Sequence, residues 1–134
     1  MAGDGEWVGC PTEDGFRMEA YLARPTGKPR GAVILAENIG GVDDTIREVA
    51  RRLALEGYLV LAPEIYTRDN LRKRMDPVHL GAAAGMRRAG KSFTHHRYPN
   101  AQHAFFDDSR PAHNSEAGAD AWGRVKAFPR QNLG

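Results

Sequence analysis

The chain has 134 residues, of which 41% are hydrophobic and 27% are charged, as in a soluble globular domain, which we expect to span residues 1–134. Nineteen Lys and Arg stand against seventeen Asp and Glu, and this net charge of +2 does not favour a nucleic-acid partner. The single Cys10 excludes an internal disulfide, and no segment resembles a membrane span or a signal peptide, so we expect a cytoplasmic protein without a membrane partner.

The first predicted elements are two short strands on either side of a turn. In "WVGCPTEDGFRMEAYLARP", residues 7–25, strand-like runs flank Glu13–Gly15, and Gly15 can take the positive φ of a tight turn. The apolar run Ala32–Ala36, "AVILA", is too short for a helix and is typical of a strand covered on both faces. We therefore expect a β-hairpin followed by a buried strand of a parallel sheet.

A helix and a second buried strand come next. Residues 40–58, "GGVDDTIREVARRLALEGY", offer Asp43 or Asp44 as N-cap, apolar residues at helical spacing, and Gly57 as a C-terminal stop. "YLVLAP", residues 58–63, is typical of a buried strand. Residues 32–63 therefore predict one β-α-β unit with a right-handed crossover, which indicates the α/β class.

The C-terminal half predicts a helix, a strand, a loop and a last helix. "LGAAAGMRRAG", residues 80–90, is interpreted as the end of an Ala-rich helix that stops at Gly90. "KSFTHHRYP", residues 91–99, alternates between two faces and predicts a strand, and the loop "NAQHAFFDDSRP" follows it. Asn114 or Ser115 should cap the last helix, which Pro129 should end or kink.

One stretch fits the phosphate-binding loop pattern G-x-x-x-x-G-K-[ST]. It is "GMRRAGKS", residues 85–92. Such a loop joins a preceding strand to a following helix, whose N-terminus helps to hold the phosphates. Here the predicted order is helix and then strand, so we interpret the match as accidental and keep a P-loop nucleotide binder only as an alternative function.

Two stretches place polar groups directly after predicted strands, where open α/β sheets form their ligand sites. In "AENIGG", Glu37 ends an apolar strand and precedes Asn38 and a glycine pair, so a carboxylate and free backbone N–H groups would meet at the sheet edge. In "YPNAQHAFFDD", His103 follows a strand among apolar neighbours and could act as a general base. The alternatives are a glutamate that only fills a turn and a histidine that is structural or exposed.

Taken in order, these stretches resemble the dienelactone hydrolase family of α/β-hydrolases. The likeness runs from "DGFRMEAYLARP" through "AVILAENIGG" and "YLVLAPEIYTR", and resumes at "RRAGKSFTHHRYPNAQHAFFDDSRP". The resemblance implies an α/β-hydrolase-like fold with a mostly parallel sheet flanked by helices and an N-terminal β-hairpin. It also implies hydrolysis of a small ester or lactone by a nucleophile and a histidine, without a cofactor.

The same resemblance implies roles for single residues. His103 would be the catalytic base, and Glu37 the glutamate that contacts the resting nucleophile. The backbone N–H of Asn38 would form one half of the oxyanion hole. Substrate contacts would come from Tyr66, Arg68 and Phe105.

The sequence departs from the family where the nucleophile is expected. The elbow G-x-C-x-G or G-x-S-x-G is absent, as is the later aspartate that orients the histidine. Cys10, Ser92, Ser109 and Ser115 all lack the elbow glycines, so the nucleophile is unknown. Asp107 stands where relatives that grip an acidic lactone should have a second arginine. We therefore predict impaired catalysis, and the alternative is a non-catalytic α/β remnant or binding domain.

The length of the middle segment explains the missing elbow. Residues 64–90 leave room for one β-α-β crossover, which needs about thirty residues, and not for three. Two central strands with their helices are therefore expected to be missing, with an internal deletion near residues 69–84. A homodimer is one way in which such a chain could complete its sheet.

Several histidines and aspartates fall close together near the C-terminal loop. They are His95, His96, His103, Asp107, Asp108 and His113. Adjacent residues of a strand point to opposite faces, so His95 and His96 could not both bind one ion, and we expect no metal site.

Overall fold

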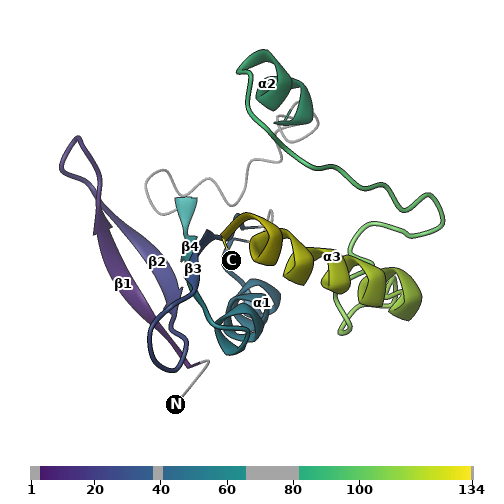
Figure 1. Cartoon of the computed structure of the whole chain (residues 1–134), viewed down its shortest axis with the longest axis horizontal. Coiled ribbons are helices and arrows are strands. Elements are labelled where there is room, and N and C mark those ends of the chain that lie inside the picture. Colours follow the sequence, from purple (N-terminus) through teal and green to yellow (C-terminus); the bar gives the residue numbers. More distant parts are fainter. Residues whose placement is uncertain (1–3, 38–40, 66–81, 134) are drawn as a thin grey trace. The chain divides into compact units, whose positions relative to one another are not determined.

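The computed structural model describes residues 4–37, 41–65 and 82–133. The elements in chain order are β1 (Gly5–Pro11), β2 (Arg17–Ala23), β3 (Gly31–Ile34), α1 (Asp44–Leu55), β4 (Tyr58–Pro63), α2 (Ala82–Arg88) and α3 (Ser115–Leu133). Figure 1 shows these elements in the colours of the sequence. They fall into two compact units. The first contains the four strands, α1 and residues 119–133, and the second contains residues 82–118.

A β-hairpin opens the first unit, as predicted. β1 and β2 pair antiparallel along their whole length. At the tip of the hairpin, the Gly15 N–H donates to the Thr12 carbonyl at 3.0 Å, and Gly15 has a φ of 81°. A residue with a Cβ rarely adopts this φ, which explains the glycine at the turn.

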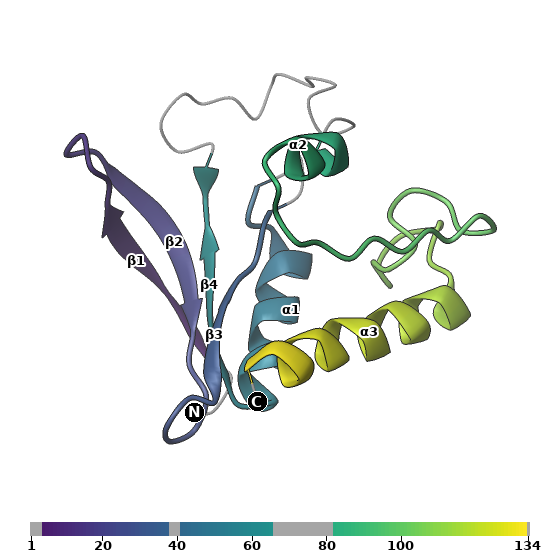
Figure 2. The same ribbon diagram turned by 45° about the horizontal axis from the view of Figure 1, so that its top comes forward.

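The four strands form one mixed sheet in the order β1-β2-β4-β3. β2 pairs antiparallel with β4, whereas β3 pairs parallel with β4, and α1 connects the two parallel strands. Figure 2 shows α1 running along one side of the sheet, where it contacts β4 most and β2 and β1 less. The predicted β-α-β unit and the α/β class are confirmed. We expected a mostly parallel sheet, and the described strands contain this single parallel pair.

α1 begins and ends at the predicted residues. The Asp43 side chain accepts the Ile46 N–H at 3.0 Å, a cap that contributes about 1 kcal/mol to helix stability. At the other end, the Gly57 N–H donates to the Ala54 carbonyl at 3.0 Å, and Gly57 has a φ of 98°. The face toward the sheet buries Ala50, Leu53 and Ala54.

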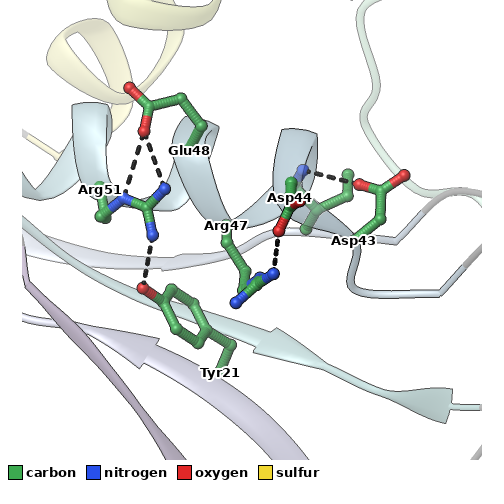
Figure 3. Close-up of polar contacts among 7 residues, drawn as sticks. Tyr21, Asp43, Asp44, Arg47, Glu48 and Arg51 are labelled. Carbon is green, nitrogen blue, oxygen red and sulfur yellow. Dashed lines mark hydrogen bonds and ion pairs between the residues drawn. The ribbon is translucent and has the colours of Figure 1, made fainter.

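Polar contacts join α1 to the hairpin (Figure 3). Arg51 donates to the Glu48 carboxylate at 2.9 Å and to the Tyr21 hydroxyl at 3.1 Å, and Arg47 pairs with Asp44 one turn earlier. Desolvation opposes the charged form of Arg51, but the hydrogen bonds with Glu48 and Tyr21 outweigh it and raise the pKa of Arg51. Arg51 therefore stays charged and links α1 to β2.

The core lies between α1 and the sheet. It consists of Tyr21, Ala23, Val42, Ala50, Leu53, Ala54, Tyr58, Val60 and Ala62. The largest fully buried side chains are Tyr58, Leu53 and Val60. Burial of an apolar side chain of this size contributes about 1.5–3 kcal/mol, so these residues dominate the stability of the first unit.

β3 is less covered than its sequence suggested. Val33 and Leu35 pack against the core, but Ile34 is 68% exposed and Ala32 is exposed as well. The prediction that both faces are buried is therefore wrong for one face. The physical reason is that β3 is an edge strand of the four-stranded sheet, with α1 on one side only.

The last helix contacts a side chain of α1 and the C-cap residue of that helix, Glu56. The Arg52 guanidinium lies 3.9 Å from the centre of the Trp122 ring, and Glu56 pairs with Lys126 at 3.9 Å and with Arg130. α3 does not end at the buried Pro129 but continues to Leu133. Proline removes only one helical hydrogen bond, and the contacts of Arg130 and Leu133 hold the last turn in place.

α2 opens the second unit and ends as predicted. The Lys91 N–H donates to the Met86 carbonyl and the Gly90 N–H to the Arg87 carbonyl, each at 3.0 Å, and Gly90 has a φ of 64°. This is a helix end built around a left-handed glycine. Residues 85–88 of the P-loop-like stretch therefore lie inside a helix, so the strand-loop-helix order of a nucleotide site is not formed there.

The strand predicted over residues 91–99 is wrong. Residues 91–98 form neither helix nor strand, and most of them are exposed. A strand needs a neighbour for its N–H and C=O groups, and an alternating sequence does not supply one. The alternating side chains of this segment also bury little apolar area on either face, so hydrophobic burial does not compensate for the missing strand pairing.

Candidate active site

Glu37 lies three residues after the end of β3, at the carboxyl end of the parallel strand pair. Both of its carboxylate oxygens are shielded from solvent, although the residue as a whole is partly exposed. The carboxyl ends of parallel strands are where open α/β sheets place their ligands. The position of Glu37 therefore agrees with the sequence analysis, and its catalytic role stays a prediction. Asn38 lies outside the described residues.

A second carboxylate lies at the end of the neighbouring strand. Glu64 follows β4 and is only 3% exposed. Its Oε2 accepts the Val42 N–H at 3.0 Å, and a Cβ on Gly41 would lie 2.6 Å from the same oxygen. The sequence analysis missed Glu64. The available signal was an acidic residue directly after an apolar strand, the same pattern that drew attention to Glu37.

His103 belongs to the second unit and is exposed. The next residue, Ala104, has a φ of 66° and is the one described residue other than glycine with a positive φ. This region costs an L-amino acid roughly 1–2 kcal/mol. Backbone strain of this kind gathers at functional sites, because it persists only where the surroundings enforce it.

Contacts on the C-terminal side of Ala104 enforce that conformation. The Phe105 ring packs against Tyr98 with 5.0 Å between ring centres, and the Phe105 carbonyl accepts the Asn114 N–H at 2.9 Å. The Asn114 side chain in turn caps α3 by accepting the Ala117 N–H at 3.0 Å. The loop that carries His103 is therefore fastened to the start of α3. Phe105, expected to contact substrate, is half-buried in this packing.

Asp107 organises the turn that follows. Its Oδ1 accepts the Ser109 hydroxyl at 2.6 Å and the Ser109 N–H at 3.0 Å, and its Oδ2 accepts the Arg110 Nε–H at 3.3 Å. Such contacts are those of a capped turn. The Ser109 hydroxyl thus donates its hydrogen bond to a carboxylate of its own turn, which does not support Ser109 as the nucleophile.

The other site candidates are placed as follows. Tyr66 and Arg68 lie outside the described residues, so their expected substrate contacts stay predictions. Cys10 lies in β1 opposite Met18, and Ser92 lies exposed in the irregular segment after α2. Neither residue stands at the turn from a strand into a helix that a nucleophile elbow requires.

Within the described ranges, no three His, Cys, Asp or Glu side chains come together in a way that could hold a metal ion. The helices in the same ranges include none that is long and apolar enough to cross a membrane.

Comparison with known proteins matches the chain to one family. A family model described as "Dienelactone hydrolase family" matches residues 18–81 and 79–133. A protein of Saccharolobus solfataricus named "Putative carboxymethylenebutenolidase" is 48% identical over 56 residues, which cover 42% of this chain and 21% of that protein. An Escherichia coli protein of the same name is 51% identical over 57 residues, covering 41% of this chain and 21% of that protein. The matched part thus spans about a fifth of the length of these relatives.

A solved structure shares the fold. The crystal structure named "Putative Dienelactone Hydrolase" from Klebsiella pneumoniae aligns with a TM-score of 0.68 at 20% sequence identity, over 96% of this chain and 98% of that chain. At this level of identity the likeness concerns the fold, an α/β-hydrolase fold, and agrees with the mixed sheet and its N-terminal hairpin. Because the family model covers well over half of its residues, this chain belongs to the dienelactone hydrolase family.

Proposed function

We propose that this chain is a hydrolase for small esters or lactones, and that its rate is impaired because the nucleophile elbow is absent. The observation that carries the proposal is Glu37, whose shielded carboxylate follows β3 at the carboxyl end of the parallel strand pair. The fastened, strained loop around His103 supports it independently.

The proposed chemistry uses His103 as a general base. Without a nucleophilic side chain, His103 takes a proton from water, and the water oxygen attacks the carbonyl carbon of the ester. The Asn38 N–H stabilises the oxyanion, and the protonated imidazole then returns its proton to the leaving alkoxide as the C–O bond breaks. The family resemblance adds Tyr66, Arg68 and Phe105 as proposed substrate contacts. This route lacks covalent catalysis, so the expected rate is far below that of an enzyme with a complete triad.

The proposed cause of the impairment is an internal deletion near residues 69–84 in a single domain spanning 1–134. Two observations support it. The family model matches in two segments that overlap at residues 79–81. Only residues 64–90, which include α2 and its glycine stop, lie between β4 and Lys91. The single Cys10 fits a reducing compartment, and we propose that the protein acts in the cytoplasm.

Hydrolysis of p-nitrophenyl acetate tests the catalytic proposal. The wild type should hydrolyse the ester faster than buffer alone. His103→Ala should reduce this enzymatic rate at least about 10-fold, because a general base contributes about 10²–10⁴ to the rate in complete enzymes. His95→Ala is the matched control, since it removes another exposed histidine of the same unit. Circular dichroism must show that all three proteins are folded.

The second candidate is a non-catalytic α/β remnant or binding domain, which the missing elbow favours. It predicts equal rates for folded wild type and His103→Ala, both at the level of buffer. That result would remove the hydrolase proposal for this chain.

We also propose that two copies pair through β3 and so complete the sheet. The edge residues Gly31, Ala32 and Ile34 carry no charge, and Ile34 is 68% exposed. An uncharged edge strand is self-complementary, because two copies related by a twofold axis can pair antiparallel without facing like charges.

A further inference from the structure

His103 lies in a tight turn that is closed by a hydrogen bond. The Phe105 N–H donates to the Gln102 carbonyl at 3.2 Å, so His103 and Ala104 are the two central residues of the turn. Of these two, only Ala104 has a positive φ, at 66°, which is the pattern of a type II turn. The third position of such a turn favours glycine, so this turn is strained at Ala104. Contacts outside the turn are therefore needed to hold it in this form.

Two hydrogen bonds fix the carbonyls on the C-terminal side of the turn. The Ala104 carbonyl accepts the Asp107 N–H at 3.1 Å, and the Phe105 carbonyl accepts the Asn114 N–H at 2.9 Å. Asp107 belongs to the same loop, whereas Asn114 stands immediately before α3. Of these two contacts, the one with Asn114 ties the turn to a regular element.

Asn114 is anchored through its side chain and through its backbone. Its Oδ1 accepts the Ala117 N–H at 3.0 Å, and its carbonyl accepts the Gly118 N–H at 2.8 Å. The first bond satisfies an N–H group that the start of a helix leaves without a partner, and the second is the first hydrogen bond of α3 itself. The N–H that holds Phe105 therefore comes from a residue with little freedom to move.

The tip of the turn gains little burial in return for its strain. Gln102 and His103 are both exposed, and the ring contact of 5.0 Å between Phe105 and Tyr98 lies beyond the tip. Backbone strain persists only where the surroundings enforce it, and it gathers at functional sites. What the anchored turn determines is the direction in which the His103 side chain leaves the backbone.

We propose that Asn114 is a positioning residue for His103. By capping α3 with its side chain and holding the Phe105 carbonyl with its N–H, Asn114 fixes the turn that presents the imidazole to the substrate. A general base must stand within hydrogen-bond reach of the proton that it removes, so a freer turn lowers the rate of that step. This inference rests on the proposed function, and Asn114 itself does not touch the substrate.

Amide hydrogen exchange tests the link without any need for catalysis. Asn114→Ala removes the cap, so the Phe105 amide that closes the turn should exchange about 5-fold faster, the factor expected from the loss of a typical N-cap. Asn114→Asp keeps an acceptor oxygen and should restore the wild-type exchange rate. Asn132→Ala is the matched control, because the Asn132 side chain also bonds to the α3 backbone, at 2.8 Å, but at the other end of the helix.

Two exchange results would overturn the inference. One is an unchanged Phe105 amide in Asn114→Ala, even with faster exchange at Ala117, because Asn114 would then only cap α3. The other is an equal increase at Phe105 and at Lys91, whose N–H bonds to the end of α2 in the same unit. That pattern reports unfolding of the whole unit and not release of one turn.

Steady-state kinetics with p-nitrophenyl acetate test the consequence for catalysis. Asn114→Ala should lower kcat about 5-fold with KM within about 2-fold, and Asn114→Asp should recover the loss. In the His103→Ala background, Asn114→Ala should cause no further fall in rate, because a residue that acts through the imidazole has no effect once the imidazole is gone.

The kinetic outcomes separate the positioning role from the proposed function. An active wild type with unchanged kcat in Asn114→Ala would overturn the positioning role alone, as would an equal fall in rate with and without the imidazole of His103. A wild type at the buffer rate would instead remove the proposed function, and the positioning role with it.

Discussion

At the scale of the residue, Ala104 is where the backbone of the His103 loop is most strained. Its φ of 66° is one that glycine adopts freely and alanine does not. Ala104→Gly should therefore stabilise the protein by about 0.5 kcal/mol, the relieved strain being partly offset by the greater freedom of glycine in the unfolded chain. The change in the urea midpoint of unfolding measures this effect.

Ala101→Gly is the control for that prediction. Ala101 lies in the same loop without a positive φ, so glycine there should only destabilise, by about 0.5–1 kcal/mol. Equal destabilisation by both substitutions would mean that the loop does not strain Ala104. If only Ala104→Gly stabilises the protein, Ala104 is strained in the wild type. That result would support the interpretation that this strain serves to present His103.

Single residues differ in how far the sequence can predict them. Glu37 could be singled out because its signal is local: an apolar run, an acid and, three positions later, a glycine pair. Glu64 carries a similar local signal, an acid directly after an apolar strand, but its contact with the Val42 N–H, 22 positions away in the chain, could not be predicted. Only the folded sheet brings these two residues together, and no local pattern contains that information.

At the scale of the element, α3 depends on one aromatic side chain. Trp122 packs against the core and lies under the Arg52 guanidinium at 3.9 Å. Trp122→Ala should cost about 2 kcal/mol of stability through lost burial and a lost cation–π contact. Phe128→Ala, on the same helix but 52% exposed, should cost less than about 1 kcal/mol. Urea unfolding compares the two, and similar losses would show that Trp122 does not anchor α3.

Elements whose ends are determined locally were predicted well. α1 has a capping aspartate and a terminal glycine within its own sequence, and the structure uses both. The prediction of a strand over residues 91–99 was wrong because a strand must pair with a neighbouring strand, and the local sequence does not show whether one is present. Pro129 does not end α3. Arg130, in the turn that follows Pro129, pairs with Glu56, which lies far away in the sequence.

At the scale of the whole molecule, the order of the elements predicted the α/β class and the resemblance of several stretches predicted the family, but neither predicted how the sheet is completed. β3 was expected to be buried on both faces, as it would be inside a larger sheet. In this chain it is an edge strand with Ile34 exposed. Composition reports which strands are apolar, whereas coverage depends on which strands and helices lie beside a strand in the folded protein.

That exposed edge leads to a prediction about mass in solution. If two copies pair through β3, light scattering coupled to gel filtration should give twice the chain mass of 14.8 kDa. Ile34→Lys should give a single chain, because it places two like charges near each other across the twofold axis. Leu55→Lys is the matched control, since Leu55 is 65% exposed at the end of α1 and should leave the dimer intact. A monomeric wild type, or a dimer that survives Ile34→Lys, would mean that β3 is not the interface and that this family fold keeps an open sheet edge.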